Sequence, residues 1–239
     1  MLLSRAHGRD LVSKRHGRLG WGMFSSLLFI FALVAAYNNV PTDLTSEDQA
    51  LFVQLHLPKD AIAPTFEQEV AQIHDIQRLL FSHVPFGLGI PQREAREPRD
   101  ILAFGQGLCY DRSRALEKAM SFVGYKARHV YLLYKGDKSL LAAAVHRRQH
   151  SHAVTEVRTS RGWMLVDSIK PWVALTRDGH PVGAKDVWRR AKEFDDLPNY
   201  LEVPYWSIPG LYSRHGQFYA PFNAIPDVNW FDFLSSGLM

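Results

Sequence analysis

Residues 105–130, GQGLCYDRSRALEKAMSFVGYKARHV, contain the only cysteine of the 239-residue chain. Glycines precede Cys109, and an apolar stripe with helical spacing runs from there to Gly124. This pattern predicts a loop and then a helix from about Cys109 to Val123, which a glycine terminates. The following residues, ARHVYLLY at 127–134, are rich in β-branched and aromatic side chains and predict a strand.

The position of Cys109 suits a nucleophile. The N-terminus of a helix carries partial positive charge and free N–H groups, which stabilise a thiolate. Gly105 and Gly107 permit a sharp turn and a close approach of the backbone. The alternative is a small, buried and unreactive side chain, which is the commoner role of a lone cysteine. A catalytic interpretation therefore needs a partner for the thiol.

A predicted hairpin supplies such a partner. HAVTEVR at 152–158 and WMLVDSI at 163–169 are predicted as strands, joined by a turn at TSRG. If the turn has a two-residue loop, His152 and Asp167 are diagonal cross-strand neighbours about 7–8 Å apart at their Cα atoms. A carboxylate in that place can orient the imidazole that activates a thiol. A register slip of one residue would separate the pair, and each residue taken alone is more simply a polar residue at a strand end.

These segments together resemble the transglutaminase-like cysteine peptidase superfamily. The resemblance covers about residues 100–170 and rests on four elements in order: Gly-x-Cys at a helix start, a G-x-x-A-R-x-V strand, a His-Ala strand ending in Glu-Val and a Gly-Trp strand ending in Asp. Two positions depart from the pattern. Val154 stands where an aromatic residue often follows His-Ala, and Ser168 stands where a proline often follows the Asp. Both departures leave the subfamily and the substrate open.

The resemblance implies a papain-like α+β fold, in which the nucleophile helix packs on an antiparallel sheet. It implies a catalytic triad of Cys109 as nucleophile, His152 as base and then acid, and Asp167 as the orienting carboxylate. The thiolate would attack a peptide or amide carbonyl, and the Cys109 N–H would hold the oxyanion with one further donor, for which Gln106 is the candidate. The thioester then passes to water in a protease or amidase, or to an amine in a crosslinking transglutaminase.

We expect hydrolysis of a peptide, protein or peptidoglycan-like amide, with no cofactor and no metal. Two alternatives stay open: a non-catalytic binding or assembly module on the same fold, and an acyl transferase that uses the same triad. A metal site in HRRQHSH, residues 146–152, is less favoured than a solvated basic loop, because no carboxylate or cysteine stands at ligand spacing. Asp111 is interpreted as a first-turn residue that the helix dipole favours, rather than as the group that orients the imidazole.

The segment LGWGMFSSLLFIFALVAAY, residues 19–37, has no charged side chain. As a helix it would rise about 28 Å, close to the hydrocarbon thickness of a bilayer. Basic residues precede it and acidic residues follow it, which predicts a single-pass inner-membrane anchor with the N-terminus inside and a periplasmic catalytic domain. The alternative is a signal peptide cleaved after Ala36. The long basic region before the segment favours an uncleaved anchor.

The net charge of +4 belongs to the N-terminal tail. Residues 1–18 carry five basic residues and one acidic residue, which leaves 23 of each in the remaining chain. A neutral domain argues against nucleic-acid binding. The hydrophobic fraction of 46% and the mixed charges are typical of a globular domain.

The domain organisation follows from these segments. We expect a basic cytoplasmic tail at 1–18, the anchor or signal segment at 19–37, a helical and loop extension at 38–98, a transglutaminase-like catalytic core at 99–197, and an aromatic, proline-rich tail packed on the core at 198–239. That tail either caps the core or lines a groove for an extended peptide or glycan.

Smaller elements are predicted around the core. Helices are predicted at 46–55, at 65–82 with Thr65 and Gln68 as a capping box, and near 184–195; a loop is predicted at 83–100, and 139–145 fits either a strand or a helix.

Overall fold

The structure, a computed structural model, describes residues 24–91, 94–145, 149–212 and 226–235. The chain divides into two compact units, Met1–Asn39 and Val40–Met239. In the first unit residues 24–37 are helical. No helix within the described part of the chain is both long enough and apolar enough to span a membrane. The predicted basic tail and residues 19–23 of the predicted anchor lie outside the described residues.

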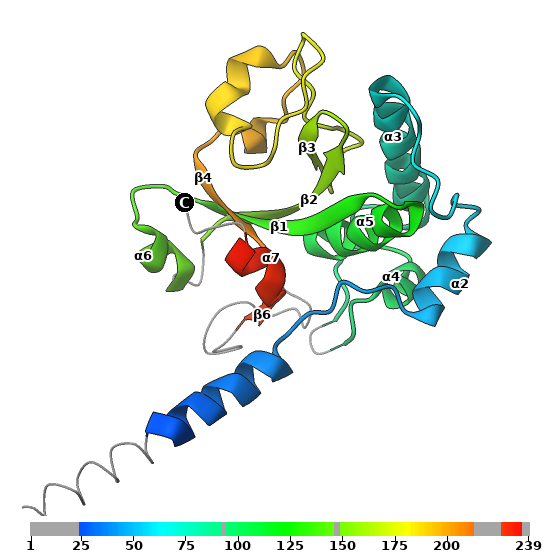
Figure 1. Cartoon of the computed structure of the whole chain (residues 1–239). Coiled ribbons are helices and arrows are strands. Elements are labelled where there is room, and N and C mark those ends of the chain that lie inside the picture. The colour runs from blue at the N-terminus through cyan, green and yellow to red at the C-terminus, as the bar shows by residue number, and fades with distance from the viewer. Residues whose placement is uncertain (1–23, 92–93, 146–148, 213–225, 236–239) are drawn as a thin grey trace, which may run out of the picture. The chain divides into compact units, whose positions relative to one another are not determined.

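The centre of the second unit is a four-stranded antiparallel sheet in the order β3-β2-β1-β4 (Figure 1). Its strands are β1 (Lys126–Tyr134), β2 (Ser151–Thr159), β3 (Gly162–Val166) and β4 (Tyr205–Pro209). The first three lie where the sequence predicts them, although β3 ends earlier than expected. The edge strand β4 was not predicted. Its segment reads as irregular, yet it is aromatic and aliphatic and ends in a proline, which an edge strand tolerates.

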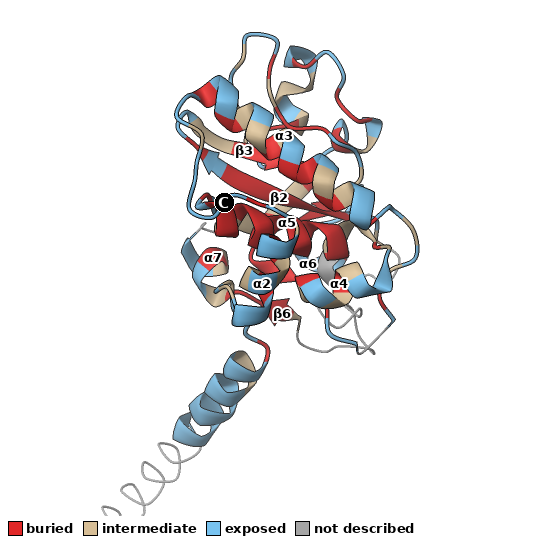
Figure 2. Cartoon of the chain, turned by 90° about the vertical axis from the view of Figure 1, so that its right-hand side faces the viewer, coloured by how far each residue is buried: buried red, intermediate tan, exposed pale blue. Residues whose placement is uncertain are grey.

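Helix α5 (Cys109–Val123) packs on this sheet against β1 and β2. Its bounds are those predicted, and Gly124 terminates it with a φ of 107°. Figure 2 shows α5 buried beside β2. The predicted apolar stripe is 0–1% exposed, at Ala115, Leu116, Ala119, Met120 and Val123. The predicted α+β arrangement, with the helix that begins at Cys109 packed on an antiparallel sheet, is therefore present.

Helices α2 (Ser46–Gln54), α3 (Phe66–His83) and α4 (Pro98–Phe104) pack against α5 or against each other. Helix α3 begins after Thr65, whose hydroxyl accepts a hydrogen bond from the Gln68 N–H as the capping prediction requires. The predicted loop at 83–100 is irregular over the described residues 84–91 and 94–97, and α4, which was not predicted, begins in its last three residues. A proline in its first turn and the Asp100 carboxylate, which accepts from the Glu97 N–H, cap a helix inside a proline- and charge-rich segment.

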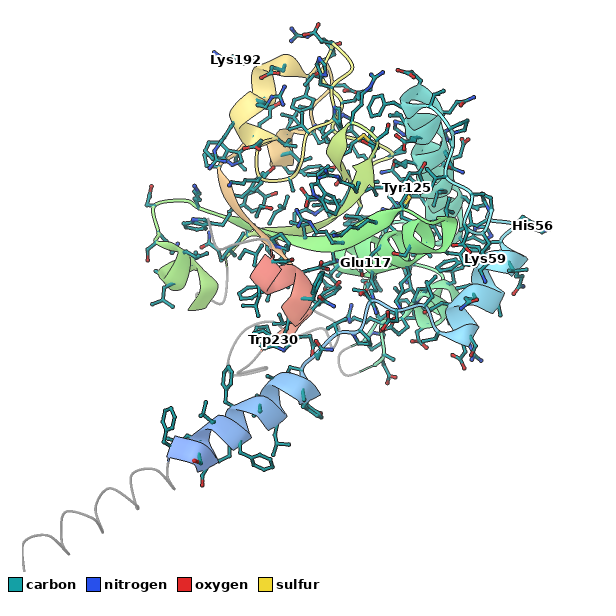
Figure 3. All side chains as sticks on the ribbon, viewed as in Figure 1. His56, Lys59, Glu117, Tyr125, Lys192 and Trp230 are labelled. Atoms are coloured by element: carbon teal, nitrogen blue, oxygen red, sulfur yellow. The ribbon has the colours of Figure 1, made fainter. Side chains whose placement is uncertain are left out.

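The remaining elements are short. The ambiguous segment 139–145 contains helix α6 (Leu140–Val145), and the helix predicted near 184–195 is the 3₁₀ helix η1 (Trp188–Glu193). Figure 3 shows Lys192 of η1 at the periphery and Glu117 of α5 in the interior. The tail adds η2 (Asn199–Leu201), β5 (Leu211–Tyr212), β6 (Asp227–Val228) and α7 (Trp230–Ser235). The predicted segment boundaries near 98 and 197 fall inside the second unit and stay a prediction.

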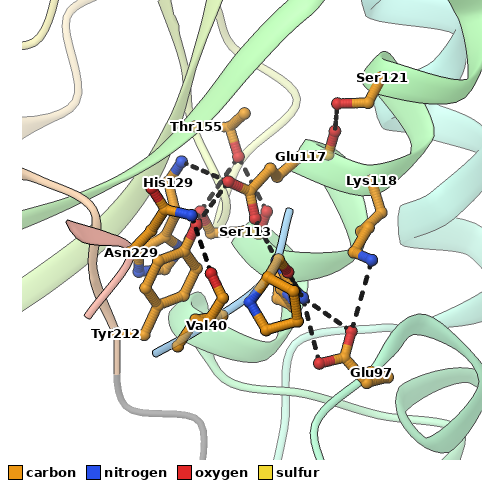
Figure 4. Close-up of polar contacts among 12 residues, drawn as sticks. Val40, Glu97, Ser113, Glu117, Lys118, Ser121, His129, Thr155, Tyr212 and Asn229 are labelled. Carbon is orange, nitrogen blue, oxygen red and sulfur yellow. Dashed lines mark hydrogen bonds and ion pairs between the residues drawn. The ribbon is translucent and has the colours of Figure 1, made fainter. Parts of the chain in front are cut away.

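Several charged side chains of α5 are buried but paired (Figure 4). Arg114 donates to Glu117 at 2.7 Å and to Glu97 at 2.9 Å, and Lys118 donates to Asp48 at 2.9 Å. A buried charge without a partner would be strongly destabilising. The same polar network includes Ser113, His129, Thr155 and Tyr212. These contacts fix the position of α5 relative to α2, α4 and β1.

Candidate active site

Cys109 is placed by the loop between α4 and α5. Gly105 ends α4 in the left-handed conformation, with a φ of 75°. The Gly107 N–H donates to the Pro85 carbonyl at 3.1 Å, and the Gly107 carbonyl accepts from the Gly87 N–H at 3.2 Å. A Cβ on Gly107 would lie 3.0 and 3.1 Å from neighbouring side chains, so this close approach favours glycine. Cys109 is a free, partly buried cysteine in the first turn of α5.

Asp111 serves the start of the helix. One of its carboxylate oxygens accepts a hydrogen bond from the Leu108 N–H at 2.9 Å, and the other pairs with the buried Arg96 guanidinium. Both oxygens are therefore occupied by local structural partners. This geometry fits the predicted first-turn role.

The β2-β3 hairpin brings His152 and Asp167 together. Thr159 pairs with Gly162 across the turn and Thr155 pairs with Val166, which is the predicted register. The His152 Nε2 atom lies 2.7 Å from the Asp167 Oδ1 atom, and the two side chains are 3% and 0% exposed. Because Nε2 is engaged by the carboxylate, Nδ1 is the ring nitrogen left for the thiol.

The surroundings of His152 favour the imidazolium form. Burial alone would lower the pKa of His152, but hydrogen bonds to Asp167 and Cys109 and the charges of these two groups raise it to about 9. Burial opposes ionisation of Asp167 as well. Hydrogen bonds from His152, Tyr200 and the Lys170 N–H nevertheless hold the pKa of Asp167 below its ordinary value. Opposite charges at short range thus outweigh desolvation in this site.

The residues that support Asp167 were not predicted from the sequence. The Tyr200 hydroxyl donates to Asp167 Oδ2 at 2.5 Å. The Gln77 side-chain amide, on α3, donates to the backbone carbonyls of Asp167 and Trp172 at 2.7 and 3.1 Å. One signal pointed to Gln77: it is a polar residue at helical spacing within the apolar face of the predicted helix at 65–82. No comparable pattern pointed to Tyr200.

Arg112, in the first turn of α5, adds a positive charge to the site. Its Nη1 donates to the Ile169 carbonyl at 3.1 Å, and its guanidinium lies 3.4 Å from the centroid of the Phe81 ring. Burial lowers the pKa of Arg112 to about 10, although the charges of Asp167 and Cys109 oppose this. Arg112 therefore stays cationic at neutral pH beside the candidate triad.

The Gln106 side chain contacts the loop before α4. Its Oε1 atom accepts a hydrogen bond from the Leu88 N–H at 3.1 Å. Its role as an oxyanion donor stays a prediction.

Cys109 and His152 both line a cleft of about 830 Å³. The cleft walls come from separate parts of the chain, and much of the lining is apolar or aromatic. These wall residues include Phe86, Tyr134, Ile169, Tyr200 and Val203. The thiol and the imidazole thus face a space that can hold a substrate.

A metal centre has no support within the described ranges, where no group of three or more His, Cys, Asp or Glu side chains could hold an ion. His146, which the metal alternative requires, lies outside these ranges.

Residues 60–168 match the family model described as the Transglutaminase-like superfamily. The matched segment contains Cys109, His152 and Asp167 on α5, β2 and the residue after β3. Over this segment, which is less than half of the chain, the sequence is similar to the transglutaminase-like superfamily. No curated protein matches the chain.

Two similar solved structures are of one protein. The periplasmic domain of TgpA from Pseudomonas aeruginosa is 21% identical over 55% of this chain and 45% of that chain, with a TM-score of 0.36. The same domain bound to ethylmercury is 23% identical over 54% of this chain and 47% of that chain, with a TM-score of 0.36. The match therefore covers less than half the length of those chains.

Proposed function

We propose that the second unit is a thiol hydrolase that cleaves peptide or amide bonds. Cys109 acts as the nucleophile, His152 as base and then acid, and Asp167 as the carboxylate that orients the imidazole. The observation that carries this proposal is the buried 2.7 Å hydrogen bond between His152 and Asp167, beside the one cysteine of the chain and on the cleft that Cys109 and His152 line.

The proposed reaction has two halves. His152 Nδ1 takes the thiol proton, and the thiolate attacks the substrate carbonyl carbon. The C–N bond breaks as the imidazolium protonates the leaving amine, which leaves a thioester on Cys109. Water then loses a proton to His152 and attacks the thioester, the C–S bond breaks, and the imidazolium returns the proton to the thiolate. The Cys109 N–H, at the start of α5, supports the oxyanion in both halves.

The location of the domain is a separate proposal. The uncharged segment 19–37, with basic residues before it and acidic residues after it, supports a single-pass inner-membrane anchor and an extracytoplasmic domain. A membrane-impermeant maleimide tests this on spheroplasts, because Cys109 is the one thiol in the chain. Labelling of intact spheroplasts is expected. Labelling only after lysis would contradict the proposed orientation.

Iodoacetamide alkylation of the full chain tests the catalytic proposal. Wild-type protein should be alkylated at Cys109 near neutral pH, and His152→Ala should slow the reaction by about tenfold or more, since the imidazole no longer takes the thiol proton. Cys109→Ser is the blank. His180→Ala is the matched control, because His180 is exposed. A folded protein whose thiol does not react, or reacts equally in His152→Ala, would favour a non-catalytic module.

Peptide and isopeptide libraries then identify the chemistry. Hydroxylamine should trap the thioester as a hydroxamate in the wild type and not in Cys109→Ser. Release of free acid supports hydrolysis, whereas incorporation of a labelled amine supports acyl transfer.

A further inference from the structure

Tyr200 contacts two members of the candidate triad, His152 and Asp167. Its hydroxyl donates to Asp167 Oδ2 at 2.5 Å. Its ring meets the His152 ring edge-on, with centroids 5.2 Å apart and an interplanar angle of 76°. Tyr200 also lines the cleft with Cys109. It belongs to η2, outside the segment 60–168 that the family model matches.

The hydrogen bonds of Asp167 leave its carboxylate little freedom to rotate. Oδ1 faces His152, and Oδ2 accepts from both the Tyr200 hydroxyl and the Lys170 N–H, the latter at 2.8 Å. Rotation about the Cβ–Cγ bond would break all of these contacts together. The plane of the carboxylate, and with it the direction of Oδ1, is therefore fixed from both sides.

The fold also fixes Tyr200 itself. The Tyr134 hydroxyl, on β1, donates to the Tyr200 carbonyl at 2.7 Å. The next residue, Leu201, is 0% exposed in the cluster that also contains Val154 of β2. The phenol is thus held by the sheet and the core, and its direction toward Asp167 is built into the structure.

We propose that Tyr200 is a positioning residue of this site. Its hydroxyl fixes the Asp167 carboxylate so that Oδ1 stays on His152, and its ring shields the hydrogen bond between His152 and Asp167 from water. The inference rests on the proposed function for its catalytic meaning, but its effect on the reactivity of Cys109 is measurable without a substrate.

A positioning role of Tyr200 should change how the reactivity of Cys109 depends on pH. The groups that act on Asp167 are Arg112 from α5, Tyr134 from β1, His152 from β2 and Tyr200 from η2. Cys109 of α5 acts on His152. The Tyr200 hydrogen bond is among the contacts that lower the pKa of Asp167. Tyr200→Phe removes that donor, so Asp167 should become protonated at a higher pH.

The experiment is iodoacetamide alkylation of Cys109 in the full chain across the pH range, followed by mass spectrometry. Tyr200→Phe should slow alkylation by about tenfold at acid pH, as expected for the loss of a hydrogen bond to a charged group. The acid limb of the plot of alkylation rate against pH should also shift to higher pH. Tyr205→Phe is the matched control, because it removes a buried phenol hydroxyl of β4 and should leave the profile unchanged. Once a substrate is identified, kcat of Tyr200→Phe should fall while its KM stays within about twofold of the wild-type value.

The outcomes separate this inference from the proposed function. If His152→Ala slows alkylation but Tyr200→Phe reproduces the wild-type profile, the positioning role is wrong and the proposed function stands. If His152→Ala has no effect, the proposed function fails first. Should Tyr200→Phe not fold, 3-fluorotyrosine at position 200 replaces it. Its hydroxyl is a stronger donor, so the acid limb should move to lower pH, and an unmoved limb would overturn the role.

Discussion

At the residue scale, two buried histidines show that the groups around an imidazole decide its protonation state. His152 has a carboxylate on one ring nitrogen, and the hydrogen bonds and charges of Asp167 and Cys109 overcome burial to raise its pKa to about 9. His129, on the neighbouring strand, contacts the Ser113 hydroxyl at 2.9 Å. Burial, with the charges of Arg114 and His152, lowers the pKa of His129 to about 3. One buried histidine therefore favours the charged form, and the other is a neutral core residue.

NMR titration of the histidine ring protons tests this difference. In the wild type, His152 should titrate at about pH 9. In Cys109→Ala its pKa should fall, because an opposite charge and a hydrogen bond that favour the imidazolium are removed. The neutral His129 is the internal control and should stay unprotonated down to about pH 4 in both proteins. A wild-type His152 that titrates near the ordinary value would contradict the described electrostatics.

At the scale of elements, the turn between α4 and α5 sets the position of Cys109. Gly105 has a φ of 75°, and an added Cβ would meet no atom within 4 Å. The cost of a side chain there is therefore backbone strain alone.

Urea denaturation of Gly105 variants measures that strain. Gly105→Ala should lower the free energy of unfolding by about 1 kcal/mol, and Gly105→Asn by less, because asparagine tolerates the left-handed region better. Equal stability of Gly105→Ala and the wild type would show that the loop does not need this conformation. Gly107→Ala makes a useful contrast, since its cost should come from the contacts at 3.0 and 3.1 Å.

Elements with strong local signals were predictable from the sequence. Helix α5 has an apolar stripe and a terminating glycine, and α3 has a cap at Thr65. Helix α4 and strand β4 were missed. Helix α4 is short and lies in a segment whose composition favours loops, and β4 is an edge strand whose conformation depends on pairing with β1.

At the scale of the whole second unit, separate clusters cover the two faces of the sheet. Met164 belongs to the cluster under α3 and α5, whereas the adjacent Leu165 belongs to the cluster around Leu201 and Tyr205. This alternation is that of a strand buried on both faces. The tail residues that follow position 197 are consequently part of the core, and they bring Tyr200 to Asp167.

Removing one of these tail contacts should affect both stability and the site. Leu201→Ala truncates a fully buried side chain, so we expect a loss of about 2–4 kcal/mol in the free energy of unfolding. Alkylation of Cys109 should slow as well, because Leu201 follows Tyr200 in the chain and its truncation should displace the Tyr200 side chain. Leu234→Ala, on an exposed side chain of α7, should change stability by less than about 0.5 kcal/mol. Equal losses in the two variants would mean that the tail is not part of the core.

Local sequence patterns were enough to predict the helix that begins at Cys109, the hairpin and its register, and so the alignment of His152 with Asp167. These features follow from local rules, because a stop signal, a two-residue turn and the strand period act over a few residues. The tertiary structure decided which groups support Asp167 and where the cleft lies. Tyr200 is 33 residues from Asp167 and Gln77 is 90 residues from it. Such contacts depend on how the tail and α3 pack against the sheet, which no local propensity specifies.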